Sequence, residues 1–287
     1  MENLDSSFVF QTDSDLVKES LNNPNYLIEY SDVVSISKEK YCIVYFSSHN
    51  IYYPNNQKEF KNKILNKNRF EWYGVRIKKG SKHIFIRDNK KQWYLNGINK
   101  DVNSIEKLEV FLKHETKGYK TIMLGSSAGG YAAVLFGSLL KSEHVISFNG
   151  QFQFYDLLET SSEDIDPVIF RNRDNKIINN FYSLKSYINN PEKVFYFWSK
   201  KSNWDRINRN HVASLGLSEV AFNTKNHGIP FLKTALNEVI NMPYQKLLKL
   251  KNKTYNPVFF SMKYGGVKNT LAFIYKLVIE KWIRKIF

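Results

Sequence analysis

The sequence is poor in cysteine and has no long apolar segment. Cys42 is the single cysteine among 287 residues, which excludes a disulfide framework and a cysteine-rich metal site. The longest purely apolar run near the middle of the chain, Val194–Trp198, is far shorter than the roughly 20 residues that a membrane-spanning helix needs. The first ten residues are acidic and polar, without the apolar core of a signal peptide. These absences predict a cytoplasmic protein.

The composition is that of a folded chain. Hydrophobic residues make up 43% of the sequence and aromatic residues 15%, enough apolar surface to offset the conformational entropy lost on folding. No internal repeat or low-complexity tract is present. A chain of this length favours one large domain, with or without an appendage, over two equal domains.

The positive charge is concentrated at the C-terminal end. The chain has 42 basic and 27 acidic residues, a net charge of +15. The segment 241–287 holds ten basic residues and one acidic residue, a net charge of +9, so the preceding 240 residues carry only +6. We therefore expect a catalytic domain over 1–240 and a basic helical appendage over 241–287. Net charge alone is no evidence of nucleic-acid binding, and because no recognition-helix pattern is present, no nucleic-acid partner is expected.

The end of the appendage has the pattern of an amphipathic helix. In Val267–Phe287, apolar residues recur at three- and four-residue spacing between lysines and arginines. A basic amphipathic helix with aromatic residues is typical of peripheral contact with an anionic membrane, which would place the protein at the inner face of the membrane. Docking of this helix on its own domain or on a second subunit fits the pattern equally well.

Short apolar runs alternate with helical patterns along the chain, which indicates an α/β sheet with helices on both faces. Early strands are expected at Asp32–Ser37 and Tyr41–Phe46, joined as a hairpin, and two more at Phe70–Ile77 and His83–Arg87. After residue 120 the alternation predicts a parallel sheet, so the whole sheet is expected to be mixed. Its later strands are expected at Thr121–Leu124, His144–Phe148, Val194–Trp198 and Glu219–Asn223.

The segment Leu124–Gly130 contains Gly-x-Ser-x-Gly with Ser127 at its centre, between a predicted strand and an alanine-rich helix. A serine nucleophile needs such a sharp strand-to-helix turn, with small residues two positions before and after it. The alternative interpretation is a glycine-rich turn that only packs a helix against a strand. A phosphate-binding loop fits poorly, because neither Gly-Lys-Ser/Thr nor Gly-x-Gly-x-x-Gly is present.

A nucleophilic serine requires a base, and His227 is the preferred candidate. Of the three histidines after Ser127, His144 begins the next strand and is expected at the opposite end of the sheet, while His211 lies within a helical pattern. His227 lies in a loop after the last predicted strand, at the sheet edge where ligands bind in such folds. The alternative for His227 is an ordinary loop histidine.

The acid that orients the base is expected in the loop after Val194–Trp198. Asp205 is the one carboxylate in that loop, and chain order Ser, Asp, His agrees with a catalytic triad on this type of sheet. Asp205 could instead, or in addition, cap a helix that starts at Arg206.

Stabilisation of an oxyanion needs two backbone N–H donors, for which we expect Ala128 and Ser48. Ser48 belongs to the loop after Tyr41–Phe46, where His49 is either a substrate contact or a surface residue. Ser126 and Trp204 flank the predicted triad and are further candidates for substrate binding. No metal site is expected.

The Gly-Ser-Ser-Ala-Gly-Gly turn, Asp205 and His227 together resemble the α/β-hydrolase superfamily over roughly residues 41–240. The resemblance implies a three-layer sandwich with Ser127 as nucleophile, Asp205 as acid and His227 as base. The Gly-Ser-Ser-x-Gly-Gly turn looks like that of bacterial proteins from capsule and surface-polysaccharide gene clusters, some of which are sugar O-acetyltransferases. The lipase-type His-Gly-Gly-Gly motif is absent.

Two functions are expected, the first from the ordered Ser127, Asp205 and His227 and the second from the basic C-terminal segment and the surroundings of the serine motif. The first is a serine-dependent carbohydrate esterase or O-acetyltransferase that acts on a bacterial surface or capsular polysaccharide. It would need no tightly bound cofactor and would use acetyl-coenzyme A as co-substrate if it is a transferase. The second is a non-catalytic accessory protein of a polysaccharide-synthesis or secretion complex.

Overall fold

The fold is built on one central sheet in a computed structural model that describes residues 4–31 and 39–286. Within these residues eight strands are arranged in the order β1-β3-β2-β4-β5-β6-β7-β8. β1 is antiparallel to β3, and every other neighbouring pair is parallel. The strands are β1 (Tyr26–Tyr30), β2 (Tyr41–Phe46), β3 (Lys82–Ile86), β4 (Lys120–Ser126), β5 (His144–Phe148), β6 (Val194–Ser199), β7 (Ser218–Phe222) and β8 (Lys253–Tyr255).

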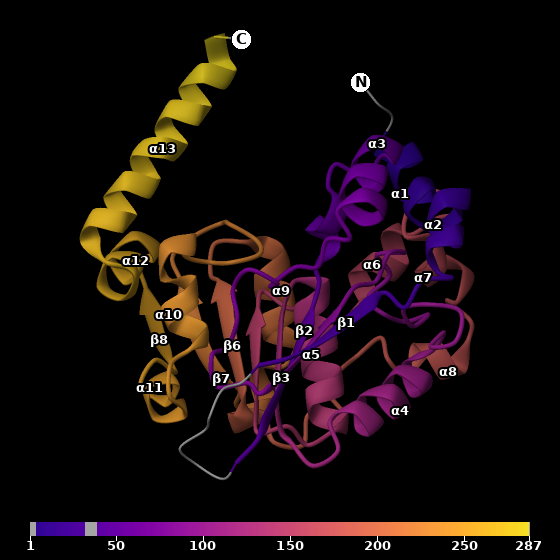
Figure 1. Cartoon of the computed structure of the whole chain (residues 1–287), viewed down its shortest axis with the longest axis horizontal. Helices are drawn as coiled ribbons and strands as arrows, with labels where there is room; N and C mark the ends of the chain where they lie inside the picture. The colour runs from indigo at the N-terminus through magenta and orange to yellow at the C-terminus, as the bar shows by residue number, and fades with distance from the viewer. Residues whose placement is uncertain (1–3, 32–38, 287) are drawn as a thin grey trace.

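The α-helices connect these strands and extend the chain at both ends (Figure 1). Their bounds are α1 (Leu4–Asp13), α2 (Asp15–Ser20), α3 (Gln57–Phe60), α4 (Ile105–Glu115), α5 (Ala128–Leu139), α6 (Tyr155–Thr160), α7 (Pro167–Arg171), α8 (Lys176–Asn179), α9 (Asn203–His211), α10 (Leu236–Ile240), α11 (Tyr244–Leu248), α12 (Pro257–Gly265) and α13 (Val267–Ile286).

Alternation of side chains along β2 shows how the sequence builds two cores. Cys42, Val44 and Phe46 belong to one buried cluster, whereas Ile43 and Tyr45 belong to another on the opposite face. Successive residues of a strand point to opposite faces, so a continuous apolar run buries both faces of the sheet.

Helices cover the two faces and complete a three-layer sandwich. α4 and α5 contribute Leu112 and Phe136 to the cluster on one face, and α10, α11 and α12 contribute Val239, Leu247 and Phe260 to the cluster on the other. The predicted α/β fold with a mixed, mostly parallel sheet is confirmed, and its architecture is α/β-hydrolase-like.

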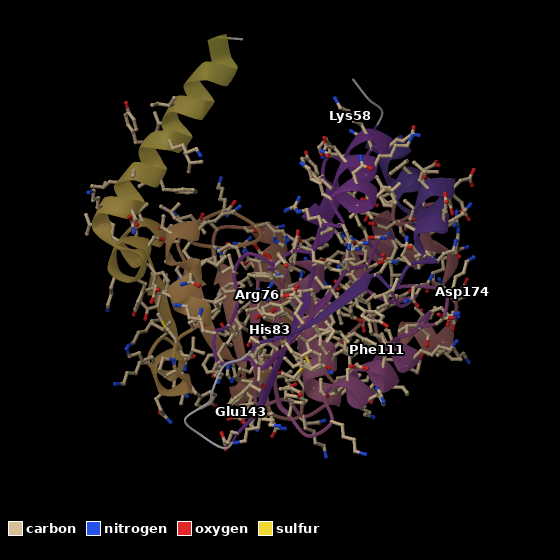
Figure 2. All side chains as sticks on the ribbon, in the orientation of Figure 1. Lys58, Arg76, His83, Phe111, Glu143 and Asp174 are labelled. Carbon is tan, nitrogen blue, oxygen red and sulfur yellow. The ribbon has the colours of Figure 1, made fainter. Side chains whose placement is uncertain are left out.

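The early strands differ from the expected ones. The expected hairpin partner Asp32–Ser37 lies outside the described residues, and both edges of β2 are paired in parallel with β3 and β4. The predicted strand Phe70–Ile77 is wrong, because this segment forms turns in which Trp72 has a φ of 69°, a value that an extended strand does not allow. The other predicted strand of this region, His83–Arg87, is confirmed as β3. Its His83 is buried (Figure 2) and is hydrogen-bonded to Tyr45.

Part of the predicted appendage is packed into the domain. β8 pairs with β7, and Leu247 and Phe260 are buried in the core that α10 also contacts. α13 alone extends away from the body of the molecule (Figure 1). The division of the chain at residue 240 stays a prediction.

The first half of α13 has one side on the domain and another in solvent. It contacts α12 and the short helix at Lys233–Ala235, yet Leu271, Tyr275 and Val278 are more than half exposed. None of the helices in the described part of the chain combines the length and hydropathy of a membrane span.

Candidate active site

Ser127 occupies a strained turn at the carboxyl end of β4, immediately before α5. Its φ is 53° and its ψ is −121°, a conformation that costs a non-glycine residue about 1–3 kcal/mol. A Cβ at Gly125 would lie 2.0 Å from the carbonyl oxygen of Gly129, and a Cβ at Gly129 would lie 2.2 Å from that of Phe46. Backbone contacts therefore require glycine at both positions of the Gly-x-Ser-x-Gly pattern.

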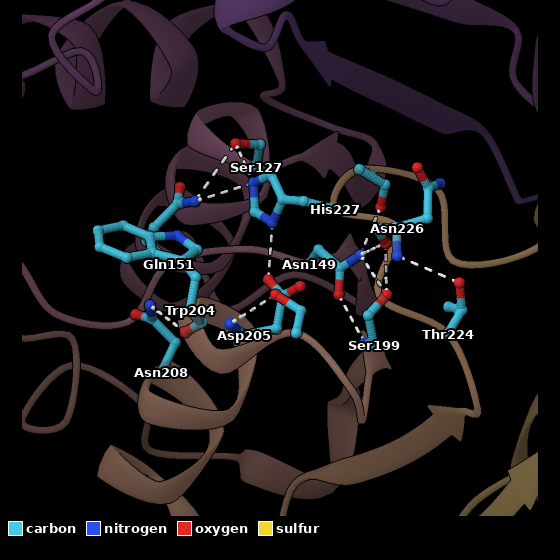
Figure 3. Close-up of polar contacts among 12 residues, drawn as sticks. Ser127, Asn149, Gln151, Ser199, Trp204, Asp205, Asn208, Thr224, Asn226 and His227 are labelled. Atoms are coloured by element: carbon cyan, nitrogen blue, oxygen red, sulfur yellow. Dashed lines mark hydrogen bonds and ion pairs between the residues drawn. The ribbon is translucent and has the colours of Figure 1, made fainter.

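The structure brings Ser127, His227 and Asp205 into one hydrogen-bonded chain (Figure 3). Ser127 Oγ lies 2.8 Å from His227 Nε2, and His227 Nδ1 lies 2.7 Å from Asp205 Oδ1. The three side chains come from the carboxyl ends of β4, β7 and β6, which parallel pairing brings to the same edge of the sheet.

The hydrogen bond to the buried Asp205 favours one tautomer of His227. The Asp205 side chain is 1% exposed, and a carboxylate only accepts hydrogen bonds, so this bond requires the proton on His227 Nδ1. The lone pair of Nε2 then faces Ser127 Oγ and can accept the hydroxyl proton. This is the arrangement that a general base and its orienting acid require.

Asp205 is not the N-cap of the helix that carries it. α9 begins at Asn203, and Ser202 is its N-cap, accepting a hydrogen bond from the N–H of Asp205. The carboxylate of Asp205 is left to bond His227.

The other histidines after Ser127 lie elsewhere. His144 is buried at the start of β5, at the opposite end of the sheet, and burial lowers its pKa to about 3. His211 bonds Ser183. Of these histidines, His227 is the one in contact with Ser127.

Asn149, at the end of β5, holds the loop that carries His227. Its Nδ2 donates to the carbonyl oxygens of Asn226 and Gly228 at 3.2 and 3.0 Å, and its Oδ1 accepts from the N–H of Ser199 at 2.8 Å (Figure 3). The residues on both sides of His227 are thereby tied to β5 and β6. Asn149 is 0% exposed, so water cannot replace these bonds without local opening.

Replacing Asn149 by alanine is expected to loosen this loop. The carbonyl oxygens of Asn226 and Gly228 lose a buried donor, so we expect the free energy of unfolding to fall by about 1–3 kcal/mol. Amide hydrogen exchange over residues 226–229 should accelerate. The control Asn180→Ala removes the same group at an exposed helix end and should leave both measurements unchanged. If exchange were unaltered in Asn149→Ala, Asn149 would not be what holds the His227 loop in place.

The two predicted oxyanion donors have different surroundings. Ala128 is the first residue of α5, so its N–H has no partner within the helix and points from a helix N-terminus. The N–H of Ser48 donates to Glu71 Oε2 at 2.7 Å, and Ser48 Oγ donates to Oε1 at 3.0 Å. Burial raises the pKa of Glu71, and the bonds from Ser48 oppose the rise. Ser48 is free for substrate only if Glu71 moves, and its role stays a prediction.

His49, one of the substrate-binding candidates, is packed rather than free on the surface. Its ring lies edge-on to Trp93 with centroids 4.5 Å apart, and its Nε2 is buried without a hydrogen-bond partner among the described residues. Burial lowers the pKa of His49 to about 3, so this imidazole is neutral near pH 7.

A cleft of about 640 Å³ opens beside His227, and Ser127 itself is not among the residues that line it. Ser126 and His227 are among its lining residues, and α13 contributes Phe273 and Leu277. Trp204 is not among the residues that line this cleft, and its proposed substrate contact stays a prediction.

Three residues of this site were not identified from the sequence: Asn149, Gln151 and Trp93. Asn149 and Gln151 follow a buried strand, as Ser127 does, and polar residues at that position were a usable signal. Trp93 lies in the segment 88–97, whose tight turns include positive φ at Trp93 and Tyr94, and no local pattern marks it.

The described residues contain no group of three or more His, Cys, Asp or Glu side chains arranged to hold a metal ion. The sheet topology and the strained serine turn give the chain an α/β-hydrolase-like fold. Neither a protein-family model nor a curated protein sequence matches the chain.

Solved structures with a similar fold include enzymes of several kinds. The capsule O-acetyltransferase of Neisseria meningitidis serogroup A is 14% identical, with 69% of this chain and 82% of that chain covered and a TM-score of 0.46. The peroxisomal α/β-hydrolase Lpx1 of Saccharomyces cerevisiae is 11% identical, with 91% and 90% covered and a TM-score of 0.42. Esterase B of Lactobacillus rhamnosis is 9% identical, with 69% and 74% covered and a TM-score of 0.40. At such identities the chemistry must be judged from the residues of this chain.

Proposed function

We propose that this protein is a serine-dependent acyl-transfer enzyme that works through an acyl-enzyme on Ser127. The observation that carries the proposal is the continuous chain of hydrogen bonds from Ser127 through His227 to the buried Asp205. A serine hydroxyl is a weak nucleophile until a base accepts its proton, and this chain supplies the base in the required tautomer.

The reaction has two matched halves. Ser127 Oγ attacks the acyl carbonyl carbon while its proton passes to His227 Nε2, and the π electrons of the carbonyl move to its oxygen. The intermediate then collapses, and the leaving alcohol or thiol takes the proton from His227. In the second half, water or a sugar hydroxyl repeats the attack on the acyl-enzyme and releases Ser127.

The strained turn and α5 contribute to the same chemistry. The turn exposes Ser127 Oγ at the sheet edge, and the free N–H of Ala128 at the helix N-terminus is available to a developing oxyanion. Acyl transfer needs both features, whereas a turn that only packs a helix on a strand needs neither.

For the substrate we propose an acylated or acyl-accepting carbohydrate of a bacterial surface or capsular polysaccharide, following the Gly-Ser-Ser-x-Gly-Gly turn. Acetyl-coenzyme A is then the proposed donor if the enzyme is a transferase. The cleft beside His227 is the proposed binding site for the larger part of the substrate.

Intact-protein mass spectrometry tests the proposal. After brief incubation with p-nitrophenyl acetate, and separately with acetyl-coenzyme A, we expect the mass of one acetyl group on Ser127, identified by peptide mapping. Acetylation by the aryl ester alone favours an esterase, and acetylation by both donors favours a transferase. If neither donor nor a fluorophosphonate labels Ser127, the acyl-transfer proposal fails and a non-catalytic accessory role is favoured.

A further inference from the structure

The side chain of Gln151 lies between Trp93 and the serine–histidine pair. Gln151 Nε2 donates to Ser127 Oγ at 3.3 Å and lies 3.4 Å from His227 Nε2 (Figure 3). Gln151 Oε1 accepts a hydrogen bond from Trp93 Nε1 at 3.2 Å. The residue is 3% exposed, in the loop that follows β5. A buried amide is therefore held against the reacting oxygen, and the triad mechanism assigns it no task.

Trp93 determines which end of the amide faces Ser127. An indole N–H only donates, so its partner must be the oxygen of Gln151, and the amide nitrogen must point to the other side. The Trp93 ring is itself fixed by Phe154 at 5.0 Å and His49 at 4.5 Å between centroids, and it is 5% exposed. The amide cannot turn over without leaving the buried indole N–H unpaired, at a cost of about 1–3 kcal/mol.

This orientation restricts the single proton of Ser127. When the amide N–H donates to a lone pair of Ser127 Oγ, the hydroxyl hydrogen is directed elsewhere, and His227 Nε2 at 2.8 Å is the nearby acceptor. The contact from Gln151 to His227 Nε2 is longer, at 3.4 Å, so the serine hydroxyl forms the stronger hydrogen bond to that lone pair.

We propose that Gln151 is a further catalytic residue of the acyl-transfer reaction and that Trp93 is its positioning residue. The Gln151 N–H directs the Ser127 proton to His227 and stabilises the negative charge that Oγ gains as its O–H bond breaks. The proton itself moves only from Ser127 to His227 and then to the leaving group, so Gln151 gives up no atom. This inference rests on the proposed function.

Kinetics of three variants test it with an aryl acetate. We expect Gln151→Leu to lower kcat by roughly 10- to 100-fold with little change in KM, because the lost bond strengthens as charge develops on Oγ. Trp93→Phe should give a smaller fall, and adding it to Gln151→Leu should cause no further loss, since both act through one amide. The matched control Gln153→Leu removes a buried amide of the same loop that bonds Asp156, and it should change kcat less than about twofold.

The Gln151→Glu variant separates a chemical role from a structural one. A carboxylate at this position accepts a hydrogen bond from the Ser127 hydroxyl instead of donating one to Oγ. Its negative charge also stabilises the protonated form of His227. The acidic limb of the kcat/KM profile should therefore move to higher pH. An unmoved profile, an unchanged kcat in Gln151→Leu, or additive effects of Trp93→Phe and Gln151→Leu would each overturn the proposal.

A measurement that needs no turnover keeps this test distinct from that of the proposed function. The ¹⁵N shift of His227 Nε2 reports the hydrogen bond from Ser127 even in an inactive protein. We expect it to change in Gln151→Leu and to stay constant in Gln153→Leu. A constant shift in Gln151→Leu would overturn the role of Gln151, whereas absent acylation of the wild-type Ser127 would overturn only the proposed function.

Discussion

A Ser127→Ala variant is expected to lose almost all acyl-transfer activity, with kcat falling by about 10⁴- to 10⁶-fold. The atom removed is the oxygen that lies 2.8 Å from His227 Nε2, and a methyl group can neither give up a proton nor form an ester. Alanine keeps the Cβ and the backbone turn, so the loss would be chemical. Hydrolysis of p-nitrophenyl acetate and fluorophosphonate labelling measure it.

Ser138→Ala is the matched control, because it makes the same change near the opposite end of α5 and should leave the rate unaltered. A third variant, Ser127→Gly, should be equally inactive but more resistant to urea than Ser127→Ala, since glycine adopts a φ of 53° without strain. Substantial activity in Ser127→Ala would remove Ser127 from the mechanism.

An Asp205→Asn variant is expected to lower kcat by about 10⁴-fold while the protein remains folded. Asparagine can donate its amide N–H to His227 Nδ1, which places the imidazole proton on Nε2. The nitrogen that faces Ser127 then has no free lone pair, so it cannot accept the hydroxyl proton. Steady-state kinetics with an aryl ester and thermal unfolding separate this loss of base function from loss of structure.

Asp174→Asn provides the comparison for this variant. The side chain of Asp174 is 93% exposed at the periphery of the molecule (Figure 2), so the same substitution there should change neither kcat nor stability. If Asp205→Asn retained most of the wild-type kcat, the acid would have to be another residue, and the proposed role of the Ser127–His227–Asp205 chain would be wrong.

Local sequence was sufficient to predict much of this site. The Ser127 turn is marked by glycines that backbone contacts require, and a strand before it and a helix after it are visible as apolar patterns. Chain order and the carboxyl ends of parallel strands were enough to choose His227 and Asp205, because topology carries them to the same edge. The distances from His227 to Ser127 and to Asp205 are set by side-chain packing, which the sequence pattern does not show.

Other features had no local signal. The segment Phe70–Ile77 has a strand-like composition, but its carboxylate Glu71 bonds Ser48 across the site and its backbone turns at Trp72. Lys253–Tyr255 is short and polar, and it becomes a strand only because β7 offers a free edge. Propensity is outweighed in both segments by contacts with residues distant in the chain.

The sequence by itself was sufficient to predict the α/β class and the serine turn, and to propose Ser127, His227 and Asp205 as partners, since these predictions depend on periodicity, glycine and the order of elements. Tertiary structure alone decided the contact of His227 with Asp205, the bonds by which Asn149 holds the His227 loop, the occupation of the Ser48 N–H by Glu71 and the orientation of Gln151. Each of these is a hydrogen bond between residues remote in sequence. Whether such a bond forms depends on differences of a few tenths of an ångström in the distance between donor and acceptor, and only the packing of the whole fold fixes that distance.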